Sequence, residues 1–206
     1  MALTIYGAPQ SRTLRVLWTA AELGLAFEHI PLAWDDPALK GPDFLAINPA
    51  GRVPAILDED FALSESLAIN LYLAKKHGSA LYPAGLEDEA RTWSWTLWAV
   101  FDLEAPLDSL RRHSLLLPEA ERQPAVIQEA MTRIGPALKR LETALSAAPY
   151  LLGDDFRVAD LNLACVLSPS RTVFLDLDPF PAVRAWLGRC HERPAWRAAR
   201  RALQAG

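Results

Sequence analysis

Cysteine and histidine are scarce in this sequence, which contains two cysteines and four histidines among 206 residues. Cys165 and Cys190 each lie in an apolar, helix-like stretch, and the sequence has no CxxC motif. This pattern argues against a secreted disulfide framework and against a dithiol redox centre carried by the protein. His113 and His191 lack the spacing of metal ligands, so we expect no metal cofactor.

An excess of positive charge and long apolar runs are also missing. The chain has 21 basic and 25 acidic residues, a net charge of -4, which gives no basic excess for binding nucleic acid. No apolar run approaches the ~20 residues needed to span a bilayer. The sequence from Met1 to Tyr6 lacks the charged segment and apolar core of a signal peptide. We therefore expect a cytoplasmic protein with no nucleic-acid or membrane partner.

The first eighty residues have the pattern of a small α/β domain. Short strands are predicted at residues 3–6, 27–32, 55–57 and 61–63. Apolar residues between 14 and 25 recur at helical spacing, and a second helix is predicted from about Glu65 to His77. The order β-α-β implies two parallel strands joined by a crossover helix. Residues 34–46 are predicted to form a loop that carries a short helix.

Beyond this domain, every long segment is typical of helix. Pro83 and Gly85 mark a linker, which we place at residues 81–87. A helix predicted from Glu87 to about Arg112 contains Pro106 as a kink. A second, from Pro124 to Ala147, is expected to bend at Gly135-Pro136. The nearly apolar segment 159–167 is predicted to be the buried central helix.

Val53-Pro54 immediately precedes the third predicted strand. An X–Pro bond adopts the cis form at modest cost, usually in a tight turn. Such a turn would leave the backbone N–H and C=O of Val53 available to an extended, peptide-like ligand. Taken alone, however, the dipeptide is explained more simply by a trans proline that opens an edge strand.

Glu65-Ser66 stands at the start of the second predicted helix. The free N–H groups and positive dipole end of a helix attract a carboxylate, to which the Ser66 hydroxyl can also donate. Glu65 offers a negative partner for an ammonium group, so the pair suits an α-amino acid end group. For the pair in isolation, simple capping of the helix by Ser64 or Ser66 with an acid in the first turn is the better explanation.

Ser11 follows the first strand, where the first helix begins. A thiol has a pKa of about 8.5, and lowering it by ~2 units requires ~2.7 kcal/mol of preferential thiolate stabilisation. A charge-assisted hydrogen bond from a hydroxyl supplies roughly 1.5–3 kcal/mol, and a helix N-terminus adds a fraction more. Ser11 is thus a candidate thiolate donor, although a capping role is equally consistent. Thr13 is a second hydroxyl in reach of the same role.

Together these segments resemble the cytosolic glutathione S-transferases. The matching segments are Ser11 with Arg15-Val16-Leu17, the run Asn48 to Leu57, and the run Glu65 to Ile69. The combination NPxGxVP followed by ESxAI is far more specific than any one piece, and the segment from Phe180 to Pro194 is similar to the family's usual ending. The resemblance covers the whole chain. It implies a thioredoxin-like α/β domain at residues 1–80 and an all-α helical-bundle domain at 88–206.

The resemblance also implies roles for individual residues. It assigns the cysteinyl unit of glutathione to Val53 with a cis bond to Pro54, the γ-glutamyl end to Glu65 and Ser66, and the glycine carboxylate to Lys40 and Arg52. Ser11 matches the catalytic serine of the theta-like and related classes. Tyr6 lies within the first strand and does not take the family's tyrosine role.

The activity implied is that of a glutathione S-transferase, which uses glutathione as co-substrate and attacks a hydrophobic electrophile held against the helical domain. A role in detoxification and a homodimeric state go with the resemblance. A glutathione-dependent disulfide or peroxide reductase is one alternative, and the lack of a cysteine near position 11 argues against it. A non-enzymatic ligand-binding or interaction module is the other, and the intact set of site residues argues against that.

Two features of the helical part stay open. Trp95, Trp98 and Asp102 share a helix face, and such an aromatic stripe more often forms core or subunit interface than a substrate pocket. At Arg157 the family commonly has a serine or threonine that forms a capping box with the aspartate three residues later. Arginine has no acceptor, so half of the box is predicted to be missing while Asp160 remains.

Overall fold

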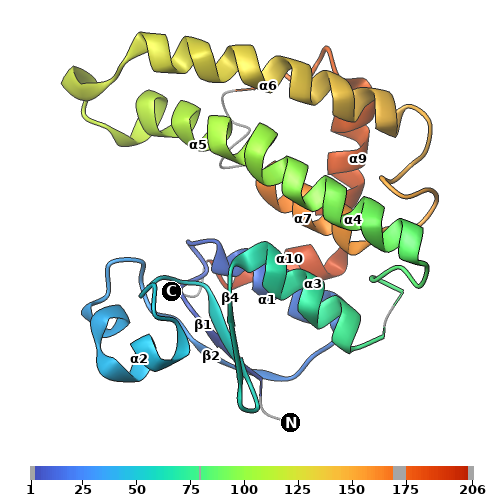
Figure 1. Ribbon diagram of the computed structural model, residues 1–206. Coiled ribbons are helices and arrows are strands. Elements are labelled where there is room, and N and C mark those ends of the chain that lie inside the picture. The colour runs from blue at the N-terminus through green and yellow to red at the C-terminus, as the bar shows by residue number, and fades with distance from the viewer. Residues whose placement is uncertain (1–2, 79, 169–174, 204–206) are drawn as a thin grey trace. The chain divides into compact units, whose positions relative to one another are not determined.

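The computed structural model describes residues 3–78, 80–168 and 175–203 (Figure 1). Its internal contacts divide the chain into two compact units. Unit 1 comprises Met1–Tyr82 together with Glu192–Gly206, and unit 2 comprises Pro83–His191.

A four-stranded mixed sheet forms the centre of unit 1 (Figure 1). Its strands are β1 (Leu3–Tyr6), β2 (Phe27–Ile30), β3 (Ala55–Asp58) and β4 (Phe61–Ser64), in the spatial order β2-β1-β3-β4. β1 is parallel to β2 and antiparallel to β3, and β3 forms a hairpin with β4. Helix α1 (Thr13–Leu23) makes the crossover between the parallel strands. This topology confirms the predicted thioredoxin-like fold.

Helices pack on both faces of this sheet. α1 and α3 (Ser66–Lys76) pack against each other and contact the strands. Ile5 of β1 and Ile56 of β3 are completely buried. α2 (Pro42–Ile47) packs through Phe44, whose ring meets that of Tyr6 edge-on at a centroid distance of 5.8 Å. Neighbouring side chains of a strand point to opposite faces, so Tyr6 and Ile5 face different helices. The loop predicted at 34–46 thus contains α2 and, before it, a 3₁₀ turn over Pro37–Lys40.

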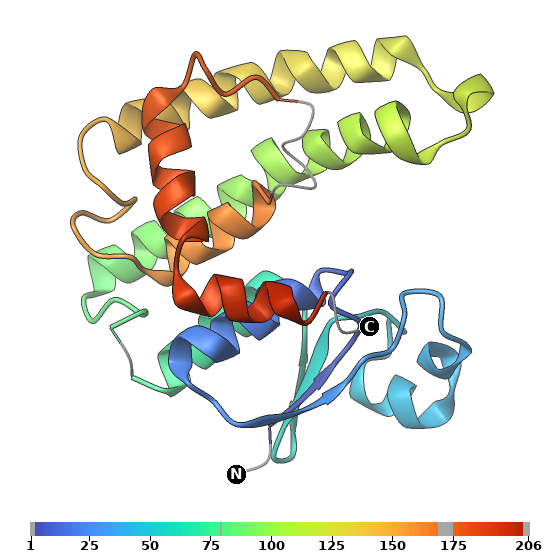
Figure 2. The same cartoon turned by 180° about the vertical axis from the view of Figure 1, so that it is seen from behind.

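The last helix of the chain, α10 (Pro194–Arg201), packs within unit 1 against α1 (Figure 2). The ring centroids of Trp18 and Trp196 lie 4.7 Å apart, and both residues are buried. Arg193 holds Glu22 with two hydrogen bonds of 2.7 and 2.8 Å, the bidentate geometry that arginine favours with carboxylates. The resemblance assigns residues 88–206 to the helical domain, whereas the contacts group α10 with unit 1. The pattern of apolar residues in 195–203 predicts the helix but not the unit that it joins.

Unit 2 is helical wherever it has regular structure among the described residues. Its α-helices are α4 (Leu86–Trp98), α5 (Ala105–Arg111), α6 (Pro124–Leu145), α7 (Val158–Val166) and α9 (Pro181–His191). Every residue of α7 is buried, as predicted for the central helix. None of the helices in the described parts of the chain is both long enough and apolar enough to cross a membrane.

A π-helical stretch divides the long helix that the sequence predicts before Arg112. α4 gives way to π-helical turns over Ala99–Glu104, and α5 follows directly. Pro106 has no N–H to donate to the carbonyl of Asp102, and its ring crowds that carbonyl. The backbone therefore widens into π-helical turns just before the proline. In α6, by contrast, the helix continues as one element through Pro136.

Asp160 connects three segments of unit 2. Its carboxylate accepts hydrogen bonds from the backbone N–H groups of Arg157 and Leu151, at 3.0 and 2.9 Å, and from the indole N–H of Trp186 at 2.8 Å. The Arg157 guanidinium, which can only donate, binds Asp155 at 2.8 Å. Burial raises the pKa of Asp160 to about 6, although these three hydrogen bonds partly oppose the rise.

This pKa predicts an unusual dependence of stability on pH. Because the pKa rises from 3.8 to about 6 on folding, the stability that Asp160 contributes is complete below pH 3.8 and is lost as the pH rises through 6. Relative to Asp160→Asn, which does not titrate, the wild type should lose about 2–3 kcal/mol of unfolding free energy between pH 4 and pH 7. Urea unfolding followed by circular dichroism measures this difference. A difference that stays constant or grows with pH would contradict it.

Candidate functional site

The register of the sheet brings the separate sequence motifs to one end of unit 1. Tyr6 pairs with Ala55, and Ala55 pairs with Ser64, so β1 ends where β3 begins and β4 ends. We call this end of the sheet the site edge. Ser11 lies five residues beyond Tyr6, Val53 lies two before Ala55, and Glu65 directly follows Ser64. Three motifs spread over more than fifty positions of the sequence, from Ser11 to Glu65, therefore converge at the site edge.

Gly7 allows the first and third strands to meet closely there. Its φ is 122°, a region that side chains rarely adopt, and a Cβ atom on it would lie 2.7 Å from the Cβ of Val53. The same Cβ would collide with the hydroxyl of Thr13. Only glycine fits this position without displacing its neighbours.

Ser11 is partly exposed at the start of α1, and its hydroxyl has several partners. Ser11 Oγ donates to the carbonyl of Ala8 at 2.8 Å, accepts from the backbone N–H of Thr13 at 3.1 Å, and lies 2.8 Å from the Thr13 hydroxyl. Thr13 is completely buried. Of the two hydroxyls that the sequence offers, only that of Ser11 is open to a bound molecule in this structure.

The peptide bond between Val53 and Pro54 is cis, as predicted. The β3–β4 ladder begins at the pair Ala55 and Ser64, so Val53 lies beyond its end. Pro54 is buried, whereas Val53 is only partly buried and packs beside Phe44. The backbone of Val53 thus stands at the border of the sheet.

Asn48 and Lys40 organise the loop that leads into Val53. The Asn48 side chain donates to the carbonyl of Arg52 at 2.7 Å and accepts from the N–H of Ala50 at 3.1 Å. Lys40 Nζ donates to the carbonyl of Gly51 at 2.9 Å. Lys40 and Arg52 are both exposed, so their charges remain accessible.

The residues that begin α3 have unusual conformations and partners. Glu65 has a φ of 71°, one of two non-glycine residues in the described parts of the chain with positive φ. Such a backbone is costly and is typical of functional sites. Ser66 is 4% exposed, and its hydroxyl accepts a hydrogen bond of 3.3 Å from Arg15, itself 5% exposed.

Sequence reasoning gave Arg15 no role, although a signal was available. Arg15 lies four residues after Ser11 on a helix whose neighbouring positions, Val16 to Ala20, are all buried. Arginine is rarely buried without a specific partner. The position of Arg15 within this stretch therefore indicates a buried arginine with a specific partner.

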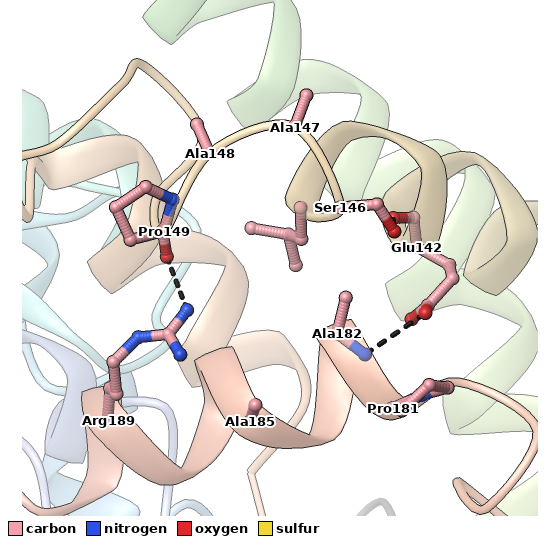
Figure 3. Close-up of a pocket in the computed structure, with 10 residues that line it drawn as sticks. Glu142, Ser146, Ala147, Ala148, Pro149, Pro181, Ala182, Ala185 and Arg189 are labelled. Atoms are coloured by element: carbon pink, nitrogen blue, oxygen red, sulfur yellow. Dashed lines mark hydrogen bonds between the residues drawn. The ribbon is translucent and has the colours of Figure 1, made fainter.

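The open pocket of about 540 Å³ in unit 2, shown in Figure 3, contains none of the predicted site residues. Glu142 accepts hydrogen bonds from the N–H groups of Ala182 and Val183, which caps the start of α9. Arg189 donates to the carbonyl of Pro149 at 2.6 Å. The charged groups of this pocket are engaged in joining the end of α6 to α9, which indicates a structural junction.

The aromatic stripe of α4 also has a structural partner. The guanidinium carbon of Arg140, on α6, lies 5.0 Å from the ring centroid of Trp95 and 4.7 Å from that of Trp98. The two rings meet edge-on at 5.2 Å. These contacts stabilise the packing of α4 on α6.

Across the described ranges, no group of three histidine, cysteine or acidic side chains is placed to hold a metal ion.

Comparisons with known proteins agree with this geometry. Residues 1–75 match the family model for the N-terminal domain of glutathione S-transferases, and residues 124–189 match that for the C-terminal domain. Glutathione S-transferase 3 of Zea mays is 35% identical over 94% of this chain and 91% of its own length. Glutathione S-transferase PARB of Nicotiana tabacum is 31% identical over 95% and 96%.

Solved structures give the same result. The theta class glutathione S-transferase from the citrus canker pathogen Xanthomonas axonopodis pv. citri, with glutathione bound, superposes with a TM-score of 0.85. It is 32% identical, and the match covers 96% of each chain. Glutathione S-transferase-I bound with lactoylglutathione has a TM-score of 0.84 at 30% identity, over 97% of this chain and 99% of that one. The chain therefore belongs to the glutathione S-transferase family.

Proposed function

We propose that this chain is a glutathione transferase that binds glutathione along the site edge and activates its thiolate. The observation that carries the proposal is the sheet register, which places Ser11, Val53 and Glu65 at one end of the sheet. Relatives solved with glutathione or lactoylglutathione bound support it.

The start of α3 suits the γ-glutamyl end of glutathione. The N-terminal N–H groups of α3 and the Ser66 hydroxyl together offer donors to the α-carboxylate. The exposed carboxylate of Glu65 offers a partner to the adjacent ammonium group. Holding an α-amino acid group requires donors for its carboxylate and a negative partner for its ammonium, and residues 65 and 66 offer both.

The middle of the tripeptide would lie against Val53. Because Val53 lies beyond the β3–β4 ladder, its backbone N–H and C=O can pair with the cysteinyl unit as a short added strand. At the far end, the exposed ammonium of Lys40 and guanidinium of Arg52 would bind the glycine carboxylate.

Ser11 would donate its hydroxyl proton to the sulfur. That proton turns from the carbonyl of Ala8 to the thiolate, while Thr13 continues to hold the Ser11 oxygen through its backbone N–H. The stabilised thiolate attacks an electrophilic carbon, so that a sulfur–carbon bond forms as the leaving group departs with its electron pair. Detoxification of hydrophobic electrophiles in the cytoplasm is the setting that fits this chemistry. The two cysteines are buried and form no disulfide, which accords with a reducing compartment.

We propose in addition that the protein forms a homodimer through α4. Large apolar side chains recur along one side of this helix and its π-helical extension, with exposed fractions of 80% at Leu86, 51% at Trp93, 58% at Leu97 and 66% at Phe101. An apolar stripe of this length is typical of an interaction surface. A second copy of the chain offers the same stripe to it.

Ser11→Ala tests the thiolate assignment. Loss of the hydroxyl donor should raise the pKa of the thiol of bound glutathione toward its free value of about 8.5. Turnover of an activated aryl halide at pH 6.5 should fall by about 10- to 100-fold. Ultraviolet thiolate absorbance and stopped-flow turnover measure these effects. Ser114→Ala is the matched control, because it removes a half-buried serine hydroxyl of unit 2 that belongs to none of the proposed binding groups, and it should change neither. An unchanged thiol pKa in Ser11→Ala would remove Ser11 from the mechanism, and no calorimetric heat with wild type would contradict glutathione binding altogether.

Glu65→Gly separates stability from binding. Glycine adopts the φ of 71° freely, so the unfolding free energy should rise by about 1 kcal/mol while affinity for glutathione falls about tenfold. Glu59→Gly is the matched control, because Glu59 also has a positive φ, of 57°, at the hairpin tip. It should be stabilised similarly and bind glutathione unchanged. Equal binding by both variants would exclude the proposed role of Glu65.

Leu97→Glu tests the proposed dimer surface. A charge within the apolar stripe of α4 should convert the protein from a species of twice the 22.7 kDa chain mass to a single chain in sedimentation equilibrium. Leu116→Glu is the control, since Leu116 is 57% exposed but lies beyond α5, away from the stripe. A monomeric wild type, or a dimeric Leu97→Glu variant, would contradict the assignment.

A further inference from the structure

Arg15 is a buried cation that links α1 to the beginning of α3. Its Nη1 atom donates to Ser66 Oγ at 3.3 Å, and the two residues are 5% and 4% exposed. They are 51 positions apart in the sequence and belong to helices that pack against each other (Figure 1). Desolvating a guanidinium is costly, so its placement beside the Ser66 hydroxyl at the start of α3 calls for a function.

The hydrogen-bond chemistry of the pair fixes the direction of the Ser66 proton. A guanidinium has five N–H donors and no acceptor, so Ser66 must be the acceptor in this contact. A serine hydroxyl has one proton and two lone pairs. With one lone pair engaged by Arg15, the proton remains available to donate elsewhere, and the charged donor polarises the O–H bond.

We propose that Arg15 is a positioning residue that orients the Ser66 hydroxyl toward the α-carboxylate of the γ-glutamyl group. This inference rests on the proposed function and adds a source of specificity to it. Ser66 would otherwise be free to turn its proton toward a nearby backbone carbonyl, as serines at helix starts do. Arg15 thus makes the start of α3 selective for a ligand that carries a carboxylate at that point.

The simplest alternative is that Arg15 only ties α1 to α3. The carbonyl of Arg15 accepts a hydrogen bond from the hydroxyl of Thr19 at 3.1 Å, so this turn of α1 is held by other contacts as well. If Arg15 has a purely structural role, replacing it should weaken the binding of every ligand at the site. If it positions Ser66, replacing it should weaken only the interaction with the carboxylate. Ligands with and without that carboxylate distinguish the two roles.

The experiment compares two ligands by calorimetry. One is glutathione, and the other is the analogue in which a 4-aminobutanoyl group replaces the γ-glutamyl group and so removes the α-carboxylate. Arg15→Met should weaken glutathione binding about tenfold and leave binding of the analogue within about twofold of wild type. Arg15→Lys, which keeps the charge and a donor, should restore part of the affinity for glutathione. An equal loss for both ligands, or no loss for either, would overturn the proposal.

A second comparison covers the case in which Arg15→Met does not fold. Ser66→Ala removes the hydroxyl that Arg15 orients, so adding Arg15→Lys to Ser66→Ala should cause no further loss of glutathione affinity. Additive losses would overturn the proposal. If the wild type binds neither ligand, the proposed function itself fails, whereas selective failure of the Arg15 variants leaves it standing.

Discussion

The structure of the site depends on the hydrogen-bonded register of β1, β3 and β4. Because Tyr6, Ala55 and Ser64 lie side by side across the sheet, the three segments that extend from them share one edge. A shift of one residue in either pairing would turn the alternate side chains to the opposite face of the sheet. The buried Ile5 and Ile56 resist such a shift, so the hydrophobic packing of the sheet also fixes the geometry of the binding groups.

Local costs are concentrated at this edge. Glu65 has a positive φ, and Arg15 and Ser66 are polar groups withdrawn from water. Each feature is unfavourable on its own, and each is held by surrounding packing. Proteins tolerate such costs where function requires a particular arrangement, which is consistent with their clustering around one proposed ligand.

Much of this architecture could be predicted from the sequence, because its signals are local. The helix of 159–167 is nearly all apolar, so it was predicted correctly. The cis bond at Val53-Pro54 was predicted from the resemblance of the combined motifs, because the dipeptide alone favours a trans proline. The grouping of α10 with unit 1 was not predicted, because the resemblance assigned residues 88–206 to the helical domain. An apolar helix face that contains Trp196 does not show that Trp18 of α1 is its partner. The contact of Arg15 with Ser66 depends on how two helices pack, and no spacing in the sequence reports that.

The roles of Ser11, Lys40, Arg52, Val53 and the Glu65-Ser66 pair form one claim, that glutathione lies along the site edge. Backbone amide chemical shifts, followed by NMR as glutathione is added, test it most directly. The account predicts saturable shifts at Ser11, Val53 and Ser66, while the amides of α6 and α9 that surround the pocket of unit 2 stay unchanged. Shifts confined to that pocket, or none at the three site-edge residues, would contradict it.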